Sequence, residues 1–302
     1  MQVARIAAPA KINLWLRVLG RRGDGYHAVR TLFQAIDLAD EVTVTRGGSG
    51  VAVRVSGADV GPERENLAYR AAAAFLEAAG DEVGARVELI KRIPAGAGLG
   101  GGSSDAAAVL RCLAALSPAP PDPVELARLG AVLGSDVPFF LCGSPLALAE
   151  GRGEVLTPLP PLPVRHLVVS LPRVHVATAD AYRALERGPL TRDARSPSNA
   201  GDARPEAPAD WRDVPERLAN DFESVVVARH PEIARSIEAL RRAGASGALL
   251  SGSGAASFGL FDGRAQAEQA AVTLTRRLGW PFLAVPTLNA MPEVIEGAAG
   301  EP

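Results

Sequence analysis

The first clear hydrophobic pattern in the chain is an alternation with a period of two over Lys11 to Leu19. Such alternation is typical of a half-buried β-strand, because successive side chains point to opposite faces. Lys11 and Asn13 therefore share one face of the predicted strand. Further β-rich runs predict strands at 41–46, 51–55 and 85–92, and the glycine-rich residues 47–50 predict the turn that joins the first two.

Three segments of the first half have helical spacing instead. Leu67 to Ala79 is rich in alanine and follows Asn66, which stands in an N-cap position. Asp105 to Leu116 repeats Ala, Leu and Val at helical spacing. Asp122 and Pro123 have the cap and first-turn proline of a third helix, which is expected to end near Gly134.

The proline-rich stretch Thr157 to Pro163 predicts a stiff linker between two domains. Residues 187–213 have few apolar anchors, so we expect an exposed, mobile loop there. The expected domains are residues 1–160 and 161–290, followed by a tail at 291–302. In the second domain we expect strands at 166–171, 255–261 and 281–285, and helices at 179–185, 220–228, 231–243 and 264–278.

Composition narrows the class of protein. The 302 residues are 47% hydrophobic, which is enough to fill two cores, and 32 basic residues nearly balance 34 acidic ones. We therefore expect no nucleic-acid partner, and no apolar run suggests a signal peptide or a membrane span. Cys112 and Cys142 predict buried thiols in a reducing cytoplasm. We expect a cytoplasmic protein that is a monomer or a weak homodimer and acts on a small molecule.

Residues 94–106, here called the phosphate-binding loop, carry the most specific chemistry. Their sequence is Pro-Ala-Gly-Ala-Gly-Leu-Gly-Gly-Gly-Ser-Ser-Asp-Ala. Five glycines leave backbone N–H groups unshielded and tolerate positive φ, so that successive amides converge on an anion. The helix that follows adds its own free N–H groups and the positive end of its dipole. The pattern predicts bound phosphate.

Two other glycine-loop classes fit poorly. Gly96, Gly98 and Gly101 match G-x-G-x-x-G, but the dinucleotide fold expects a second strand that ends in an acidic residue about 20 positions later. Here 117–123 is a proline-rich turn, which disfavours a nicotinamide-dependent dehydrogenase. A Walker A loop is also disfavoured, because no lysine precedes Ser103.

Four segments, in one order, resemble the signature blocks of the GHMP kinase superfamily: 9–14, 94–106, 134–140 and 251–254. The resemblance implies an α+β, two-domain GHMP kinase fold. Its N-terminal domain would resemble domain 2 of ribosomal protein S5, and its C-terminal domain would be ferredoxin-like. The resemblance also implies ATP and Mg²⁺ as cofactors. The motifs at 25–27, 31–34 and 64–67 resemble the branch that phosphorylates a cytidyl diphosphate sugar alcohol for isoprenoid synthesis.

The family motifs place the expected catalytic residues at Lys11 and Asp136. Asp136 is the expected general base or hydroxyl orienter, and Lys11 is its expected partner, which would stabilise charge on the substrate oxygen. Asn66 and Lys91 resemble positions that border the adenine. Asp105 is left out of the expected site, because a carboxylate beside a triphosphate would repel it. The expected ATP-binding residues are Asn66, Lys91, Pro94, Gly96, Gly98, Leu99, Gly100, Gly101, Gly102, Ser103 and Ser104.

For the second substrate, the resemblance implies a pyrimidine pocket in which Tyr26 and Tyr182 sandwich the cytosine and His27 bonds its edge. The expected substrate-binding residues are Asn13, Tyr26, His27, Thr178, Tyr182, Gly252, Ser253 and Gly254. No metal ligand is predicted beyond the hydroxyls of Ser103 or Ser104. Two alternatives stay open: another GHMP kinase, for mevalonate-type or homoserine substrates, and a non-catalytic nucleotide-binding protein on the same fold.

Overall fold

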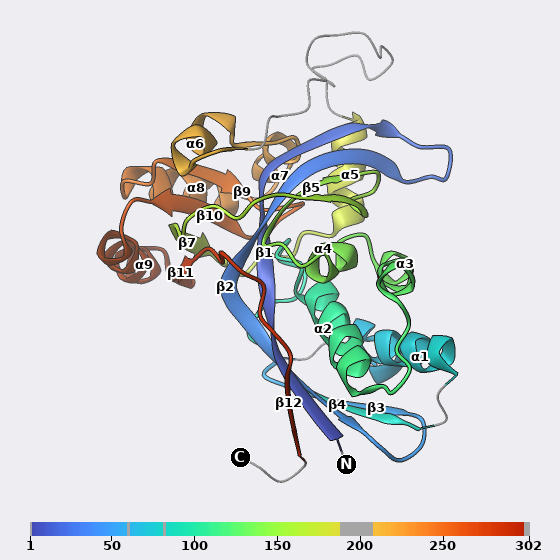
Figure 1. Ribbon diagram of the computed structural model, residues 1–302. Helices are drawn as coiled ribbons and strands as arrows, with labels where there is room; N and C mark the ends of the chain where they lie inside the picture. The colour runs from blue at the N-terminus through green and yellow to red at the C-terminus, as the bar shows by residue number, and fades with distance from the viewer. Residues whose placement is uncertain (1, 59–60, 81–82, 188–207, 299–302) are drawn as a thin grey trace.

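Two β-sheets packed against each other organise the chain (Figure 1). The computed structural model describes residues 2–58, 61–80, 83–187 and 208–298. The larger sheet contains β1 (Gln2–Arg21), β2 (His27–Arg46), β3 (Val51–Ser56), β4 (Ala85–Ile90), β5 (Leu146–Glu150), β6 (Val155–Pro158), β8 (Ala219–Asn220) and β12 (Ile295–Ala298). The smaller sheet contains β7 (His166–Ser170), β9 (Gly247–Leu250), β10 (Ser257–Phe261) and β11 (Phe282–Pro286).

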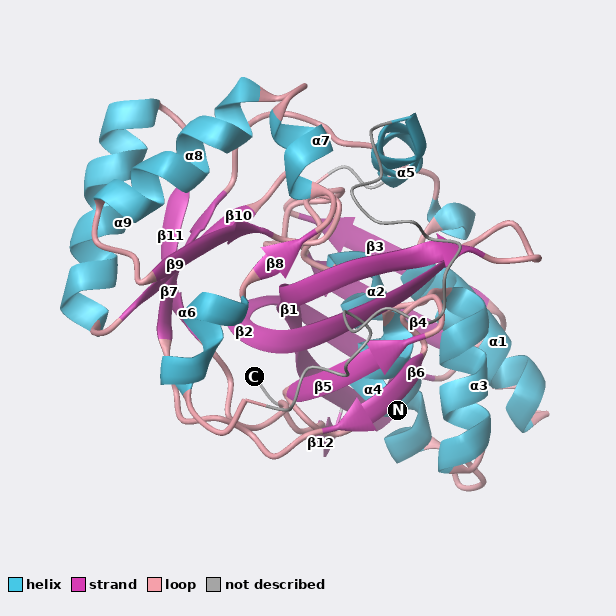
Figure 2. Ribbon diagram, turned by 90° about the horizontal axis from the view of Figure 1, so that it is seen from above, coloured by secondary structure: helices cyan, strands magenta, loops and turns pink. Residues whose placement is uncertain are grey.

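Helices cover one face of each sheet (Figure 2). The α-helices are α1 (Leu67–Ala79), α2 (Gly101–Leu116), α3 (Pro123–Leu133), α4 (Val137–Leu141), α5 (Thr178–Arg187), α6 (Val214–Arg217), α7 (Glu223–Val227), α8 (Pro231–Arg242) and α9 (Arg264–Leu278), and single 3₁₀ turns lie at Glu63–Glu65 and Trp211–Asp213.

β1 and β2 form a long antiparallel hairpin that is the centre of the larger sheet. The predicted strands at 11–19 and 41–46 are parts of these longer strands. The first half of β2 was not predicted, because residues 31–36 are all buried and their side chains therefore lack an alternation of apolar and polar types. The turn at 47–50 is present, but β4 lies between β2 and β3, so the two joined strands do not pair.

Local sequence signals account for the helix ends near the site. Asn66 caps α1 by accepting a hydrogen bond from the Ala68 N–H at 2.8 Å, and Gly80 ends the helix in the left-handed conformation. Asp122 caps α3 in the same way, as predicted. α2 begins at Gly101 rather than at Asp105, because the last two glycines of the phosphate-binding loop continue into helical backbone.

The C-terminal half differs from the sequence prediction in three places. Ala219–Asn220 form β8 parallel to β1, so the helix expected from residue 220 begins at Glu223. The strand Gly247–Leu250 was missed. Of the loop expected at 187–213, residues 188–207 lie outside the described residues, but Trp211 is buried and donates from Nε1 to the carbonyl of Pro163 at 2.6 Å.

The expected tail at 291–302 is also partly structured, because β12 pairs with the beginning of β1. A shared core joins the two sheets. Ile12 and Leu14 of β1 pack in one buried cluster with Leu167 of β7 and Phe258 of β10. The two domains therefore meet directly at β1, the strand that carries Lys11. The boundary near residue 160 stays a prediction.

The two cysteines are free thiols, as expected. Cys112 is fully buried in α2, and this burial raises the pKa of its thiol to about 12. Such a thiol is inert at neutral pH, because the thiolate is the reactive form. Cys142, after α4, is partly buried.

Candidate active site

Lys11 is the residue at which the predicted signature blocks meet. Its side chain is almost fully buried, and its Nζ donates to Asn13 Oδ1 at 2.7 Å and to the carbonyl of Gly98 at 3.0 Å. The same ammonium lies 3.5 Å from Asp136 Oδ2. The structure thus brings together the two residues expected to be catalytic, although 125 positions of sequence separate them.

Asn13 holds Lys11 in place. The strand bulge after Asn13 is a register shift in the β1–β2 pairing, and the Asn13 amide donates from Nδ2 to Thr31 Oγ1 at 2.8 Å. Thr31 in turn donates to the carbonyl of Trp15 at 2.6 Å. Because Asn13 is 1% exposed and both ends of its amide are bonded within the protein, its contacts fit a residue that orients Lys11.

Asp136 stands immediately before α4, with its side chain 30% exposed. Asp136 is therefore accessible to solvent and to a substrate, whereas Lys11 beside it is buried. The pKa of Tyr182 is raised to about 12, first by burial and second by the negative charge of Asp136. This effect places the expected catalytic carboxylate close to an expected pyrimidine-pocket residue of the other domain.

The phosphate-binding loop has the backbone that its glycines predict. Gly96, Gly98 and Gly100 have φ values of 68°, 77° and 74°, a region that side chains disfavour. A Cβ on Gly98 would lie 2.3 Å from the carbonyl oxygen of Ser251, so only glycine fits where the loop meets the C-terminal domain. Leu99 is buried in the core, and its carbonyl accepts from the Lys11 N–H at 2.9 Å.

The start of α2 offers free amides. Its N-cap, Gly100, has no side chain to accept hydrogen bonds from the first turn, and no described side chain does so. The two predicted hydroxyls differ: Ser104 is fully buried, whereas Ser103 is partly exposed. Ser103 Oγ lies 3.7 Å from the place that a Cβ on Gly134 would take, and so faces the block that contains Asp136. Pro94 stands at the entrance of the loop.

The Lys91 side chain is buried, and its ammonium contacts Asp40 and Asp105. The hydrogen bond to Asp105 Oδ2 measures 2.7 Å. Asn66 acts as the cap of α1, and Leu67 beside it approaches Gly102 at the start of α2. The adenine contacts of Asn66 and Lys91 stay a prediction.

The glycine loop at 251–254 lies against the phosphate-binding loop. A Cβ on Gly252 would lie 3.1 Å from the Gly98 carbonyl, and the Ser251 hydroxyl donates to that same carbonyl at 3.1 Å. Gly254, like Gly252, has a positive φ. Thr178 and Ser253, both expected to line the substrate pocket, are joined through their hydroxyls at 2.9 Å.

The aromatic residues expected around the cytosine are arranged differently from the predicted sandwich. Tyr182 stacks on His27, with ring centroids 4.4 Å apart and planes at 17°. Tyr26 is 55% exposed, and its ring lies under the Arg152 guanidinium, 4.8 Å away. His27 Nε2 also contacts Glu186 Oε1 at 3.0 Å. The three aromatic residues are neighbours, and Tyr182 faces His27 rather than Tyr26.

Sequence reasoning missed several residues of this region. His175 projects from the C-terminal domain beside the loop, with its Nδ1 3.2 Å from the place that a Cβ on Gly96 would take. Asp40, Glu186 and Ser251 also contact residues of the predicted site. Ser251 lies within the signature block at 251–254, although it was not among the expected binding residues. The others had no sequence signal, because their contacts depend on pairing between distant segments.

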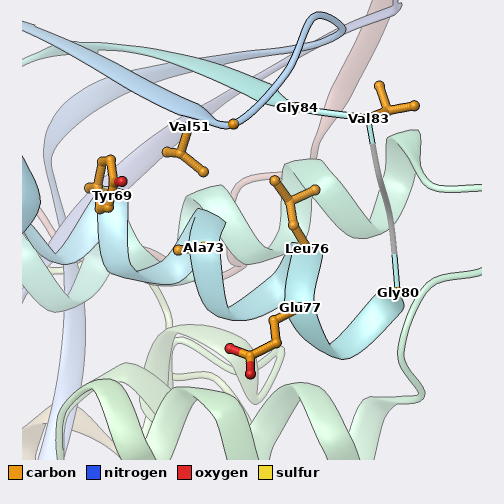
Figure 3. Close-up of a pocket in the computed structure, with 9 residues that line it drawn as sticks. Val51, Tyr69, Ala73, Leu76, Glu77, Gly80, Val83 and Gly84 are labelled. Carbon is orange, nitrogen blue, oxygen red and sulfur yellow. The ribbon is translucent and has the colours of Figure 1, made fainter.

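One cavity of about 440 Å³ lies away from this region, between α1 and the ends of β3 and β4 (Figure 3). Tyr69, Leu76 and Glu77 line it from the helix, and Val51 and Val83 from the opposite side. None of these residues belongs to the predicted site. Over the described ranges, no helix is long and apolar enough to span a membrane.

Comparisons with known proteins define the class of this molecule. The sequence profile of the GHMP kinases N terminal domain matches residues 66–144, and that of the GHMP kinases C terminal domain matches residues 206–279. The chain belongs to the GHMP kinase family. Its two-domain α+β fold is the fold that the motifs predict.

Relatives within that family point to one enzyme. A 4-diphosphocytidyl-2-C-methyl-D-erythritol kinase of Deinococcus radiodurans is 47% identical over 277 residues, covering 90% of this chain and 89% of the relative. One of Geobacter metallireducens is 44% identical, covering 95% of this chain and all of the relative. A crystal structure of 4-(cytidine 5'-diphospho)-2C-methyl-D-erythritol kinase superimposes with a TM-score of 0.76 at 42% identity, covering 94% of this chain and 98% of that one.

Proposed function

We propose that this protein transfers the γ-phosphoryl group of ATP to the 2-hydroxyl of 4-diphosphocytidyl-2-C-methyl-D-erythritol. The products are the 2-phosphate and ADP, and the step belongs to isoprenoid precursor biosynthesis. The single observation that carries the chemistry is the contact of the buried Lys11 ammonium with Asp136 and with the Gly98 carbonyl of the phosphate-binding loop. The identity of the substrate rests on the relatives that share 40–47% of their residues with this chain.

Phosphoryl transfer needs an aligned hydroxyl and charge stabilisation at the reacting oxygens. The Asp136 side chain is partly exposed beside Lys11. Its carboxylate therefore accepts a hydrogen bond from the substrate hydroxyl, and it takes the proton as the hydroxyl oxygen bonds to phosphorus. Lys11 stabilises the carboxylate and the negative charge on the reacting oxygens. Because Lys11 is already bonded to the loop carbonyl, it moves with the loop that holds the phosphates.

The phosphates would lie on the amides at the start of α2, where the helix dipole and the uncapped N–H groups both favour an anion. The residues beside the proposed phosphate position are compatible with a bound Mg²⁺. Mg²⁺ is commonly held by few protein oxygens together with substrate phosphates, and the partly exposed Ser103 hydroxyl faces the Asp136 block. Ser103 would hold the ion, which when bound neutralises charge on the transferring phosphoryl group.

The cytosine would enter beside His27. Entry requires Tyr182 to leave its stack on His27, after which the base lies between aromatic side chains with His27 at its edge. Thr178 and Ser253, already joined to each other, line the side of this pocket that the C-terminal domain provides. Other GHMP substrates such as mevalonate and homoserine contain no base to fill this space.

A panel of acceptors tests the proposal. Purified protein is given ATP and Mg²⁺ with the cytidyl diphosphate sugar alcohol, with mevalonate or with homoserine, and ADP release is measured. We expect turnover with the first acceptor and none above background with the others. Equal turnover with mevalonate or homoserine would favour another GHMP kinase, and ATP binding without any turnover would favour a non-catalytic protein.

A further inference from the structure

The turn between β5 and β6, residues 151–154, touches both ends of the proposed acceptor site, and the proposed chemistry does not use it. The Val29 N–H, near the start of β2, where the pyrimidine pocket is expected, donates to the carbonyl of Gly151 at 2.7 Å. A Cβ on Gly153 would lie 3.7 Å from Asp136 Oδ1. The turn therefore lies between the expected pyrimidine pocket and the carboxylate that would accept the hydroxyl proton.

Arg152 is the only cationic residue of this turn, and its guanidinium faces the pyrimidine pocket. Its Cζ lies 4.8 Å from the centre of the Tyr26 ring, and its side chain is 27% exposed. A guanidinium above an aromatic ring still donates from its N–H groups, because these lie in its own plane rather than across its face. The contact with Tyr26 thus holds the cation in place without using its hydrogen bonds.

Few of the hydrogen-bond donors of Arg152 are occupied. Its Nε lies 3.5 Å from Glu154 Oε1, and its Nη2 makes one long hydrogen bond, of 3.4 Å, to the carbonyl of Ala131. The Glu154 carboxylate is directed into the turn, where its Oε2 accepts from the Arg152 backbone N–H at 2.5 Å. Because a guanidinium carries five N–H donors, Arg152 retains donors for an anion.

Other arginines near the pocket are less suited to bind an anion there. Arg22 and Arg30 have carboxylates at 3.1 and 2.9 Å. Arg21 lies opposite His27 in the β1–β2 pairing and is exposed at the outer end of the hairpin. Arg152 differs from all three, because it is partly buried, faces the pocket and has only a long contact with a carboxylate.

The order of groups in the proposed acceptor matches the position of Arg152. The acceptor has cytosine at one end and the sugar alcohol at the other, and its diphosphate lies between them. A base beside Tyr26 and a hydroxyl at Asp136 therefore place the phosphates along the β5–β6 turn. A phosphate group taken out of water needs charged hydrogen-bond donors, and a guanidinium is the side chain that matches it best.

We propose that Arg152 binds the diphosphate of the acceptor substrate and is a specificity-determining residue of the proposed kinase. This inference rests on the proposed function, which brings a cytidyl diphosphate group to this site. Two N–H groups of the guanidinium match two phosphate oxygens, so Arg152 favours a nucleoside diphosphate over a nucleoside. Glu154 stays on the backbone N–H of Arg152 and maintains the shape of the turn.

A series of cytidine ligands tests this inference. Cytidine and CDP are titrated into the protein, with the ATP site filled by a non-hydrolysable ATP analogue, and calorimetry gives the dissociation constants. We expect CDP to bind the natural protein more tightly than cytidine by about tenfold or more, the usual effect of a hydrogen bond to a charged group. In Arg152→Gln the two ligands should bind within about threefold of each other, with little change for cytidine.

Each other outcome is decisive. Equal affinity of the natural protein for CDP and cytidine overturns the inference, and so does an Arg152→Gln variant that keeps the preference for CDP. A variant that loses affinity for both ligands by the same factor would show that Arg152 only shapes the base pocket, which also overturns the inference. Failure of both ligands to bind the natural protein contradicts the proposed function instead.

Three further variants make the comparison specific. Arg152→Lys keeps the charge but loses the paired donors, so its preference for CDP should be intermediate. Arg21→Gln removes an exposed cation near the same pocket, and Arg128→Gln removes one from α3, where it is paired with Glu125 at 2.7 Å. Both lose one positive charge, as Arg152→Gln does, and both should bind CDP as the natural protein does. Loss of the CDP preference in Arg21→Gln, with retention in Arg152→Gln, overturns the inference.

Kinetics separates this role from a purely structural one. In Arg152→Gln the KM for the acceptor should rise by about tenfold or more, while the KM for ATP stays constant. An equal rise in both KM values contradicts the inference, because it indicates a general disturbance of the site. If Arg152→Gln does not fold, Arg152→Lys decides the question, since a CDP preference equal to that of the natural protein would show that the paired donors are not used.

Discussion

Lys11 connects three parts of the molecule that are remote in sequence. Its neighbours Asn13, Gly98 and Asp136 come from the same strand, from the phosphate-binding loop and from the turn before α4. A buried ammonium is stable only when its donors are occupied, so these contacts also fix its position. The resemblance of the motifs predicted the pairing of Lys11 with Asp136, but the role of Asn13 depends on the bulge that follows it and was not predictable.

Replacing Asp136 tests its role at the residue scale. Asp136→Asn keeps the shape and removes the proton acceptor, so kcat should fall by about 10²–10⁴-fold while ATP still binds. Turnover assays and ATP titration are compared for the variant and the natural protein. Loss of ATP affinity with normal turnover would contradict the role. Asp122→Asn, which retains a helix-capping side chain on α3, is the control and should keep full activity.

The pKa of Asp105, which burial raises, makes the stability of the folded protein depend on pH. Its pKa is about 7 in the folded protein and near the ordinary value of 3.8 in the unfolded chain. The stabilisation from its neutral form is therefore complete below about pH 4 and is lost as the pH rises to about 7. Asp105→Asn lacks this loss, so its free energy of unfolding relative to the natural protein should increase between pH 5 and 8, by up to about 3 kcal/mol.

Denaturant melts at several pH values measure that difference. The control is Glu125→Gln, because the Arg128 hydrogen bond lowers the pKa of Glu125 and its charge stays constant over the same pH range. Its effect on stability should not change between pH 5 and 8. A pH-independent effect of Asp105→Asn would mean that the carboxyl group stays ionised throughout.

At the scale of elements, the loop between β4 and α2 depends on contact with another domain. Only glycine fits at position 98 of this loop, for two reasons. Its φ is 77°, and its Cα lies close to the Ser251 carbonyl. Gly98→Ala should raise the KM for ATP strongly, by about tenfold or more, because the loop must move away from Lys11. Gly143→Ala is a matched control, since its φ is 79° and nothing lies within 4 Å of the added methyl group.

Steady-state kinetics on both glycine variants, with melting temperatures, separates the two effects. Backbone strain is common to both and should lower stability by about 1 kcal/mol in each. Only Gly98→Ala should change the KM for ATP. An equal change in KM for both variants would show that strain, rather than the contact with Ser251, governs the loop.

The sequence predicts elements best where local signals mark both ends. α1 has its expected bounds, because Asn66 caps its start and Gly80 permits the left-handed turn at its end. The first half of β2 has no such signal. Because α2 covers one of its faces and the smaller sheet approaches the other, its side chains do not alternate between apolar and polar types. Lys91 illustrates the same limit: the pairing of Glu41 with Ile90 brings Asp40 beside it, and no local pattern shows that pairing.

At the scale of the whole molecule, the domains share a core, and this predicts a single unfolding transition. Ile12 and Leu14 pack with Leu167 and Phe258 across the boundary, so neither domain keeps its apolar surface covered without the other. Heat capacity and circular dichroism should give one coincident transition. Two separate transitions would show that the domains are independent in stability, as the sequence division at residue 160 alone would suggest.

The pairing of β12 with β1 places Gln2 opposite Ala298, so the first and last described residues lie at the same corner of the larger sheet (Figure 1). Lys11 lies about 30 Å further along the same strand. A tether attached beside either residue would therefore hold the molecule in nearly the same orientation, with its reaction centre turned away from the support. The two attachment points, near Gln2 and near Ala298, are interchangeable in this respect.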